Sequence, residues 1–498
     1  MLAWTIYLSF LGAGLLTLLP RNRAAAARWL ALLTALAGLA AAVAGTVQFP
    51  GGAGATTLIK TRWIPPLHIQ YFLAADGISV TLVLLTGIAA VAGILFSWNI
   101  EHRAKEFFAF YLALIGGVYG VFLSFDLFLL FVFYEIAIIP KYFIIAIWGS
   151  TRREYGAMKL ALYSFVGSAM VLVGMIAAYV VAGHLTGRYT FDLTALAQVH
   201  FPAGFQRWAF PLVFVGFGIL AGLWPFHTWA PTGHVAAPTA ASMLLAGVVM
   251  KLGAYGCLRV AMTLFPAGVM MWRTEIAALA VIGIVYGAMV ALVQRDFKFV
   301  IGYSSVSHMG FVLLGLMTLN QIGLDGAVLQ MFSHGILAGL LFAVVGRMVY
   351  DRTHTRDLGE LETMGLSHAL PFAAATFVLA ALASMGLPGF SGFVAELQVL
   401  IGAWSAFPTA GVCAGIGIVI GVAYLLRAVQ RAFFAEGAEK PGKAAAPELP
   451  PISWPERLGA GLLLLASLVV GLYPQVLLNL IAPSVTSLLE TMRKGGAL

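Results

Sequence analysis

The chain is divided into long apolar segments that are separated by short polar connections. A helix that spans a bilayer needs about 20 apolar residues, and these segments reach that length. We count about fourteen of them, at 2–20, 27–48, 78–99, 107–124, 126–148, 156–184, 208–229, 240–263, 274–293, 299–317, 325–349, 368–402, 409–432 and 456–482. The apolar runs are continuous rather than alternating, which argues against a β-barrel. The pattern predicts an all-α, polytopic membrane protein.

The composition indicates that lipid surrounds most of the protein. Hydrophobic residues make up 61% of the 498 residues and charged residues only 10%, whereas soluble domains have roughly 25% charged residues. The net charge of +8 does not indicate a nucleic-acid partner, because the basic residues are scattered between apolar runs. Cys257 and Cys413 are too few for a zinc or iron–sulfur site. We therefore expect no metal and no redox cofactor.

The distribution of Lys and Arg predicts the orientation in the membrane. Every second connection, beginning with the one that holds Arg21 and Arg23, carries roughly twice as many basic residues as the connections between them. The positive-inside rule places the richer connections in the cytoplasm of a bacterium and both termini on the periplasmic side of its inner membrane. The connection at 435–457 is expected to be a solvated cytoplasmic loop.

Two of the apolar segments are interrupted near their middle by glycine and proline. Pro225 follows the sequence Gly218–Trp224, and Pro388 lies within Gly386–Gly392. Because proline breaks the helix ladder, we expect broken helices, the seventh and the twelfth. Interrupted helices at matching positions of two halves mark the transport path in transporters. Ordinary kinks are the alternative.

The spacing of the two breaks also predicts the domain organisation. Helices 1–3 occupy residues 1–106, and two inverted five-helix repeats follow at 107–263 and 274–432. The remaining residues, 433–498, form the cytoplasmic loop and the fourteenth helix.

Several ionisable residues fall inside or near the edges of predicted spans, namely Glu135, Lys251, His308, His334 and Glu396, together with Lys141. Each charge at bilayer depth is costly, by about 2.5–3.5 kcal/mol or more. Structural ion pairing or snorkelling to the helix ends can explain one such residue. For the whole set it is a poor explanation, because so many buried charges are energetically costly without a function. A series of groups poised between charge states is a proton relay in physical terms. His227 and His234 flank a Trp-Ala-Pro sequence without nearby thiolates or carboxylates, and their spacing fits no zinc pattern.

Specific sequence stretches carry a family resemblance. They include Asp76-Gly-Ile-Ser, Pro225-Phe-His-Thr-Trp-Ala-Pro, Lys251-Leu-Gly-Ala-Tyr-Gly and Tyr303-Ser-Ser-Val-Ser-His-Met-Gly. With these stretches the chain resembles the antiporter-like subunits of complex I (NADH:quinone oxidoreductase) and of multisubunit cation/proton antiporters. Within that family Glu396, where related subunits carry lysine, makes the chain similar to the subunit M group.

The resemblance implies a role for each ionisable residue. Glu135 corresponds to the carboxylate of the fifth helix and Lys251 to the central lysine of the eighth. His308 and His334 would link the halves, and Glu396 would end the output half-channel. His227, His234, Pro225 and Pro388 have supporting roles. The partners it implies are L-like and N-like antiporter subunits of the membrane arm.

The chain departs from the family pattern in the seventh helix. The family carries a lysine five positions before the Pro-Phe-His sequence, and this chain has Leu220 there. That lysine normally pairs with the carboxylate of the fifth helix. Lys141 lies six residues after Glu135, or about 240° around a helix, so the two do not share a face. We hypothesise that Lys141 nevertheless replaces the missing cation, from the neighbouring turn or through water. Snorkelling of Lys141 to the cytoplasmic edge is the alternative.

The expected function is therefore proton translocation coupled to electron transfer in other subunits of complex I. Two alternatives remain open. One is a subunit of a cation/proton antiporter or membrane-bound hydrogenase, which would have the same fold and a different partner. The other is a structural subunit of complex I that no longer pumps, which Leu220 would favour.

Overall fold

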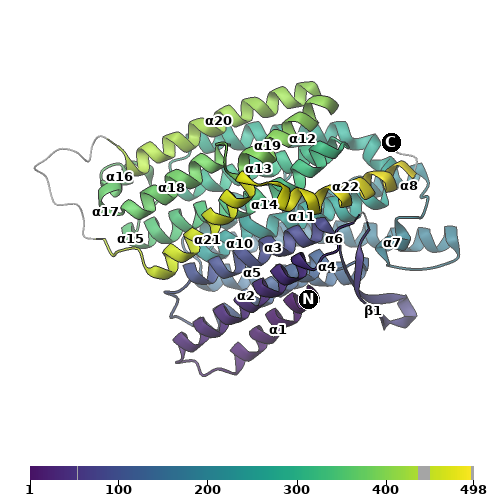
Figure 1. Ribbon diagram of the computed structural model, residues 1–498, viewed down its shortest axis with the longest axis horizontal. Coiled ribbons are helices and arrows are strands. Elements are labelled where there is room, and N and C mark those ends of the chain that lie inside the picture. Colours follow the sequence, from purple (N-terminus) through teal and green to yellow (C-terminus); the bar gives the residue numbers. More distant parts are fainter. Residues whose placement is uncertain (53, 436–448, 495–498) are drawn as a thin grey trace, which may run out of the picture.

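The computed structural model describes residues 1–52, 54–435 and 449–494. Within these residues the chain forms a bundle of long helices (Figure 1). Twelve helices are long and apolar enough to cross a membrane. The shorter α1 and the broken pair α18–α19 account for the two remaining predicted spans. The all-α, multi-pass fold expected from the sequence is confirmed. Residues 436–448 of the predicted cytoplasmic loop lie outside the described part of the chain.

The helices follow the predicted order closely. The first three are α1 (Ala3–Leu18), α2 (Ala24–Val47) and α3 (Gly77–Phe96). The next five spans are α4 (Ala104–Leu123), α5 (Leu127–Trp148), α6 (Arg153–Thr186), the broken pair α8 (Ala203–Ala221) and α9 (Trp229–Ala236), and a composite eighth helix. The eighth helix runs through α10 (Thr239–Leu244), the π-helical turn η2 (Leu245–Val249), α11 (Met250–Gly256) and the π-helical turn η3 (Cys257–Met262).

A second set of five spans follows. It consists of α12 (Pro266–Val293), α13 (Phe297–Met317), α14 (Gln321–Ala343), the broken pair α18 (Pro371–Ser384) and α19 (Ser391–Ala406), and α20 (Pro408–Phe433). Helix α14 continues through the π-helical turn η4 (Val344–Tyr350) into α15 (Asp351–Thr353). Short helices at the connections are α7 (Leu193–Leu196), α16 (Leu358–Leu361) and α17 (Leu366–Ala369).

Two features differ from the expected fold in detail. The expected last span, 456–482, is two helices, α21 (Trp454–Leu472) and α22 (Gln475–Lys494). A β-hairpin that the apolar pattern did not predict joins α2 to α3. Its strands β1 (Thr56–Ile64) and β2 (Ile69–Ala75) are antiparallel, and η1 (Pro65–Leu67) forms the turn. The hairpin belongs to a polar connection, where hydropathy carries no signal for strands.

The hairpin and the basic connections lie at opposite ends of the bundle. Figure 1 shows β1 and the C-terminus at one end and α15, α16 and α17 at the other. We call the first the hairpin end. We call the other the basic end, because it carries the connections that hold Arg21, Arg103, Arg152, Arg295 and Arg356.

The two sets of five spans share a local pattern with opposite direction. Asp126 caps α5 at the hairpin end, and its backbone forms an isolated antiparallel bridge with Asp192, which caps α7. Asp296 caps α13 at the basic end and forms the same bridge with Asp357, which caps α16. The same pair of capping aspartates joined by a backbone bridge occurs at opposite ends of the bundle, which is the arrangement expected of an inverted repeat. The repeat boundaries given above stay a prediction.

Candidate functional site

The centre of the site is a contact between the eighth and eleventh spans. Nζ of Lys251 on α11 lies 2.8 Å from Nδ1 of His334 on α14 and also donates to the carbonyl oxygen of Ala246. Lys251 is completely buried and His334 almost so. A buried ammonium is tolerated only where hydrogen bonds replace its hydration. The two acceptors meet this requirement.

The pair continues into a second buried contact. The ring of His308 on α13 stacks on His334, with the ring centres 5.3 Å apart. Nδ1 of His308 lies 2.9 Å from Oε1 of Glu396 on α19. Gln330, one helical turn before His334, donates to the same carboxylate oxygen at 3.2 Å, and the hydroxyl of Ser384 lies 3.2 Å from Nε2 of His308. Four sequence-predicted residues therefore form one continuous buried line, Lys251–His334–His308–Glu396.

Backbone geometry brings the two central helices close enough for the Lys251–His334 contact. A Cβ at Gly335 would lie 2.6 Å from the carbonyl oxygen of Gly247, and one at Gly247 would lie 3.0 Å from that of Gly335. The helices cross where neither has a side chain. Gly247 lies in the π-helical turn η2, and Ala246, in the same turn, provides the carbonyl that accepts from Lys251. Such turns interrupt the regular ladder and are frequent at functional sites.

The two helix breaks are built alike. Gly222 after α8 has φ +85° and Gly386 after α18 has φ +82°, a conformation that favours glycine. In each break the next amide, of Leu223 or Leu387, donates to a carbonyl five residues earlier, at 2.9 and 3.0 Å. The prolines Pro225 and Pro388 lie within the breaks. The second break places Gly386 beside the carboxylate of Glu396.

In the first half, the ionisable residues do not form direct pairs. Oε1 of Glu135 and Nζ of Lys141, both on α5, are buried and have no hydrogen-bond partner within the described residues. No ion pair within 4.0 Å joins them in that part of the chain. Lys141 is only 1% exposed, which does not fit snorkelling to the edge. Leu220 is also buried, on α8.

The two supporting histidines are buried near the first break. His227 follows Pro225 and packs its ring against Tyr286, with the ring centres 5.4 Å apart. His234 on α9 packs against Phe342, at 4.9 Å. The ring nitrogens of both find no hydrogen-bond partner among the described residues. Buried polar atoms of this kind are normally satisfied by water.

Comparisons with known proteins identify the family. The family described as NADH:quinone oxidoreductase/Mrp antiporter, TM, matches residues 124–421, a range that contains every member of the buried line. The chain belongs to this family. NADH-quinone oxidoreductase subunit M of Rhodobacter capsulatus is 36% identical over 502 residues, covering 97% of this chain and 95% of the relative.

Two solved structures extend the comparison. A chain of respiratory complex I from Thermus thermophilus with bound NADH is 29% identical, with a TM-score of 0.87, 98% of this chain covered and 100% of that chain. A chain of the Mrp complex from Dietzia sp. DQ12-45-1b is 22% identical, with a TM-score of 0.83, 100% of this chain covered and 98% of that chain. The second likeness shows the shared fold alone. The resemblance to antiporter-like subunits is confirmed.

Beyond the buried line, this member of the antiporter family has a cavity near each end of the bundle, each large enough for several water molecules. At the basic end, a cavity of about 180 Å³ is lined by Lys298, Asn99 and Asp351 among others. Lys298 is buried and donates to the carbonyl of Ala237 at 3.1 Å. His234 lies three residues before Ala237. The cavity therefore reaches the connection between α9 and α10 from the basic end.

At the hairpin end, a polar chain leads inward from a cavity of about 160 Å³ lined by Asp76, Arg259 and residues of α22. Arg259 forms an ion pair with Asp76, and its Nε donates to the hydroxyl of Tyr255 at 3.2 Å. Ser79 Oγ lies 3.1 Å from the same hydroxyl. Tyr255 is one helical turn from Lys251. These contacts join the hairpin end to the turn that follows Lys251.

Sequence reasoning missed Gln330, Ser384, Tyr255 and Arg259 as members of the polar network. Gln330 and Tyr255 are each four residues from a predicted site residue on the same helix, and side chains at this spacing lie on one face. That spacing was a usable signal for both. Ser384 is the last residue of α18, and only the second break directs it toward His308.

Proposed function

We propose that this chain translocates protons as a membrane subunit of an NADH:quinone oxidoreductase. One observation carries the proposal, namely the buried line of Lys251, His334, His308 and Glu396, with polar contacts of 2.8 and 2.9 Å at its two ends and a ring stack of 5.3 Å between the histidines. Ionisable groups at this depth are expensive unless they are used. The subunit M relative supports the choice of complex.

The geometry gives each residue of the line a task. We assign the donor role in the 2.8 Å contact to Lys251, so that a neutral His334 carries its proton on Nε2, which has no partner among the described residues. A proton cannot pass through the stacked ring faces, so transfer to His308 runs around the ring edges through water. His308 then donates to Glu396, while Gln330 holds that carboxylate in place. Charges this close inside protein strongly influence one another, so loading one site favours release from the next.

Pumping by this line needs energy from elsewhere in the complex. Moving one charge across the membrane against 100 mV requires about 2.3 kcal/mol. We assign electron transfer to other subunits, whose changes would alter the charge at the ends of the line. The L-like and N-like antiporter subunits are the partners that the family resemblance implies.

Substitution of Lys251→Met in the assembled complex tests the proposal. NADH oxidation and proton uptake are measured together in inverted membrane vesicles, with Leu252→Met as the matched control because Leu252 is also buried on α11. We expect the ratio of protons moved to NADH oxidised to fall in the Lys251 variant alone. Normal assembly with an unchanged ratio would instead identify a structural subunit. Sodium-driven proton exchange without NADH would identify an antiporter.

We also propose that the basic end faces the cytoplasm and that both termini are periplasmic. The concentration of basic residues at one end supports this orientation. Thr57→Cys at the hairpin end and Thr151→Cys at the basic end, each in a Cys413→Ser background, test it with a membrane-impermeant maleimide. Labelling of Thr57→Cys from the periplasmic side and of Thr151→Cys only in inverted vesicles is the expected result. The reverse pattern would overturn the orientation.

A further inference from the structure

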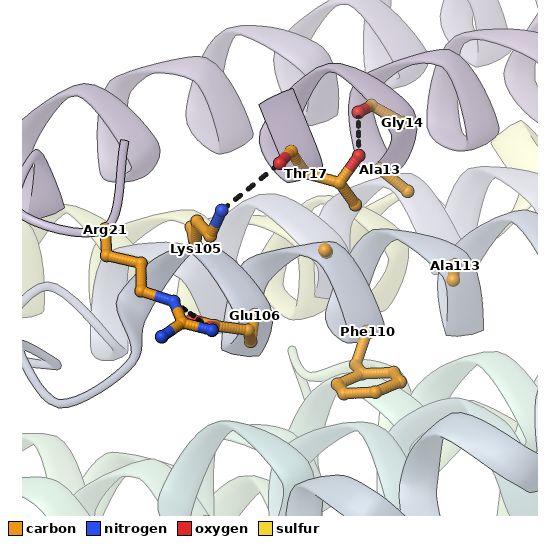
Figure 2. Close-up of a pocket in the computed structure, with 9 residues that line it drawn as sticks. Ala13, Gly14, Thr17, Arg21, Lys105, Glu106, Phe110 and Ala113 are labelled. Atoms are coloured by element: carbon orange, nitrogen blue, oxygen red, sulfur yellow. Dashed lines mark hydrogen bonds and ion pairs between the residues drawn. The ribbon is translucent and has the colours of Figure 1, made fainter. Parts of the chain in front are cut away.

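A groove between α1 and α4 lies apart from the buried line and opens at the basic end (Figure 2). It encloses about 470 Å³. Its walls are formed mainly by small or apolar side chains, namely Ala13, Gly14 and Thr17 on α1 and Ala109, Phe110 and Ala113 on α4. Its mouth is formed by Arg21, Lys105 and Glu106. The groove is therefore apolar along the helices and charged only where they end.

The mouth continues into a second hollow that is charged throughout. This hollow of about 440 Å³ is lined by Arg21, Arg103 and Glu106. Glu106 lies 3.8 Å from Arg21 and 4.0 Å from Arg103. Lys105 donates to the last carbonyls of α1, those of Thr17 and Leu19. Two arginines flank one carboxylate and Lys105 lies at the same mouth, so the mouth keeps a surplus of positive charge.

We propose that this groove binds an anionic phospholipid. Its phosphate would lie between Arg21 and Arg103, and one acyl chain would lie along Gly14, Ala109 and Ala113. The charge argument decides between occupants, because a zwitterionic lipid or an apolar helix would leave the surplus positive charge without a counterion. A free phosphate ion would occupy only the charged mouth and would leave the apolar groove exposed to lipid tails. Basic residues near a membrane surface attract anionic lipids by about 1 kcal/mol each.

Gly14 offers a way to fill the groove without disturbing the fold. A Cβ added at Gly14 would meet no atom within 4 Å, so a larger side chain points into open space. Gly14→Leu therefore occupies the volume assigned to the acyl chain and leaves every cation in place. Gly461→Leu on α21 is the matched control, because Gly461 is also exposed and open.

The test is photolabelling of the complex in vesicles that contain a diazirine-bearing phosphatidylglycerol or the matching phosphatidylcholine. Labelled peptides are mapped by mass spectrometry. We expect phosphatidylglycerol to label the α1 and α4 segments preferentially. Gly14→Leu should abolish this labelling, and Gly461→Leu should leave it unchanged. Arg21→Gln and Arg103→Gln should each reduce it about fivefold, whereas Arg152→Gln and Arg295→Gln, at exposed positions of the same end, should not.

Three outcomes would overturn the proposal. Equal labelling by both lipids would show that the charged mouth does not select the anionic lipid over the zwitterionic one. Loss of labelling on addition of inorganic phosphate at millimolar concentration, with labelling retained in Gly14→Leu, would indicate a simple anion site. A cross-link from a photoreactive residue at position 14 to a neighbouring subunit would show that protein occupies the groove.

Discussion

Nζ of Lys251 and Nδ1 of His334 lie 2.8 Å apart between two helices that cross at paired glycines. The first prediction replaces the acceptor. His334→Phe keeps a flat ring against His308 but removes both nitrogens, so Lys251 keeps only a backbone acceptor and the line is interrupted. We expect the proton-to-NADH ratio, measured in vesicles, to fall by the share that this subunit contributes. His184→Phe, at an exposed position on α6, should leave the ratio unchanged. A His334→Phe complex with an unchanged proton-to-NADH ratio would contradict the assigned path.

The second prediction concerns the glycine crossing that makes this contact. Gly335→Ala would place a Cβ 2.6 Å from the carbonyl of Gly247 and 2.7 Å from Leu85, and overpacking of this kind costs about 1–3 kcal/mol. Gly339→Ala, one turn later, meets nothing closer than 4.0 Å. Alanine there should be neutral or stabilising by up to about 1 kcal/mol. The thermal aggregation midpoint of the purified complex should fall for Gly335→Ala alone. Equal midpoints for the two variants would show that the helices can accommodate a methyl group at the crossing.

The sequence predicts the helices well because most spans are continuous apolar runs, and some of them begin at a capping residue. Asp126 and Asp296 precede α5 and α13, and both accept hydrogen bonds from the first amides of those helices. The breaks were also predictable, since glycine and proline interrupt two of the runs. The β-hairpin and the start of α22 were not, because hydropathy is uninformative in a polar connection and along an amphipathic helix.

The residues of the site were predictable, but their pairing was not. Glu396 and His308 are 88 positions apart, and only the crossing of α13 and α19 brings them to 2.9 Å. The sequence showed that Lys141 and Glu135 do not share a face of a straight helix, and the structure shows no direct ion pair between them in its described part. Whether Lys141 replaces the missing cation therefore depends on what lies between them, which one-dimensional spacing does not encode.

The third prediction concerns pH at the hairpin end. Burial raises the pKa of Asp126 to about 6, opposed by the backbone amides of Gln70, Leu129 and Phe128. Burial would also raise the pKa of Asp192, but hydrogen bonds from Lys60 and Thr194 hold that pKa below its usual value. Folding raises the pKa of this carboxyl, so the folded state binds the proton more tightly than the unfolded state does. The free energy of unfolding therefore increases as pH falls through about 6.

Hydrogen exchange at the hairpin measures this effect. The amide of Gln70 donates to Asp126, and its exchange, corrected for intrinsic rate, should be slower at about pH 5 than at about pH 7.5. Asp126→Asn should remove the difference, because the amide does not titrate. Glu101→Gln, at an exposed position of the basic end, should retain it. A pH difference that survives in Asp126→Asn would assign the effect to another group.

The fourth prediction tests whether Lys141 replaces the cation absent from position 220. Lys141→Met should lower the proton-to-NADH ratio, by no more than the share that this subunit contributes, because Glu135 then has no neighbouring cation on α5 to stabilise its charge. Ile144→Met, also buried on α5, is the control. The double variant Lys141→Met with Leu220→Lys moves the cation to the position that family members use, and we expect it to regain part of the lost pumping. If Lys141→Met alone pumps normally, the first half of the chain works without a cation beside Glu135, and translocation rests on the line from Lys251 to Glu396.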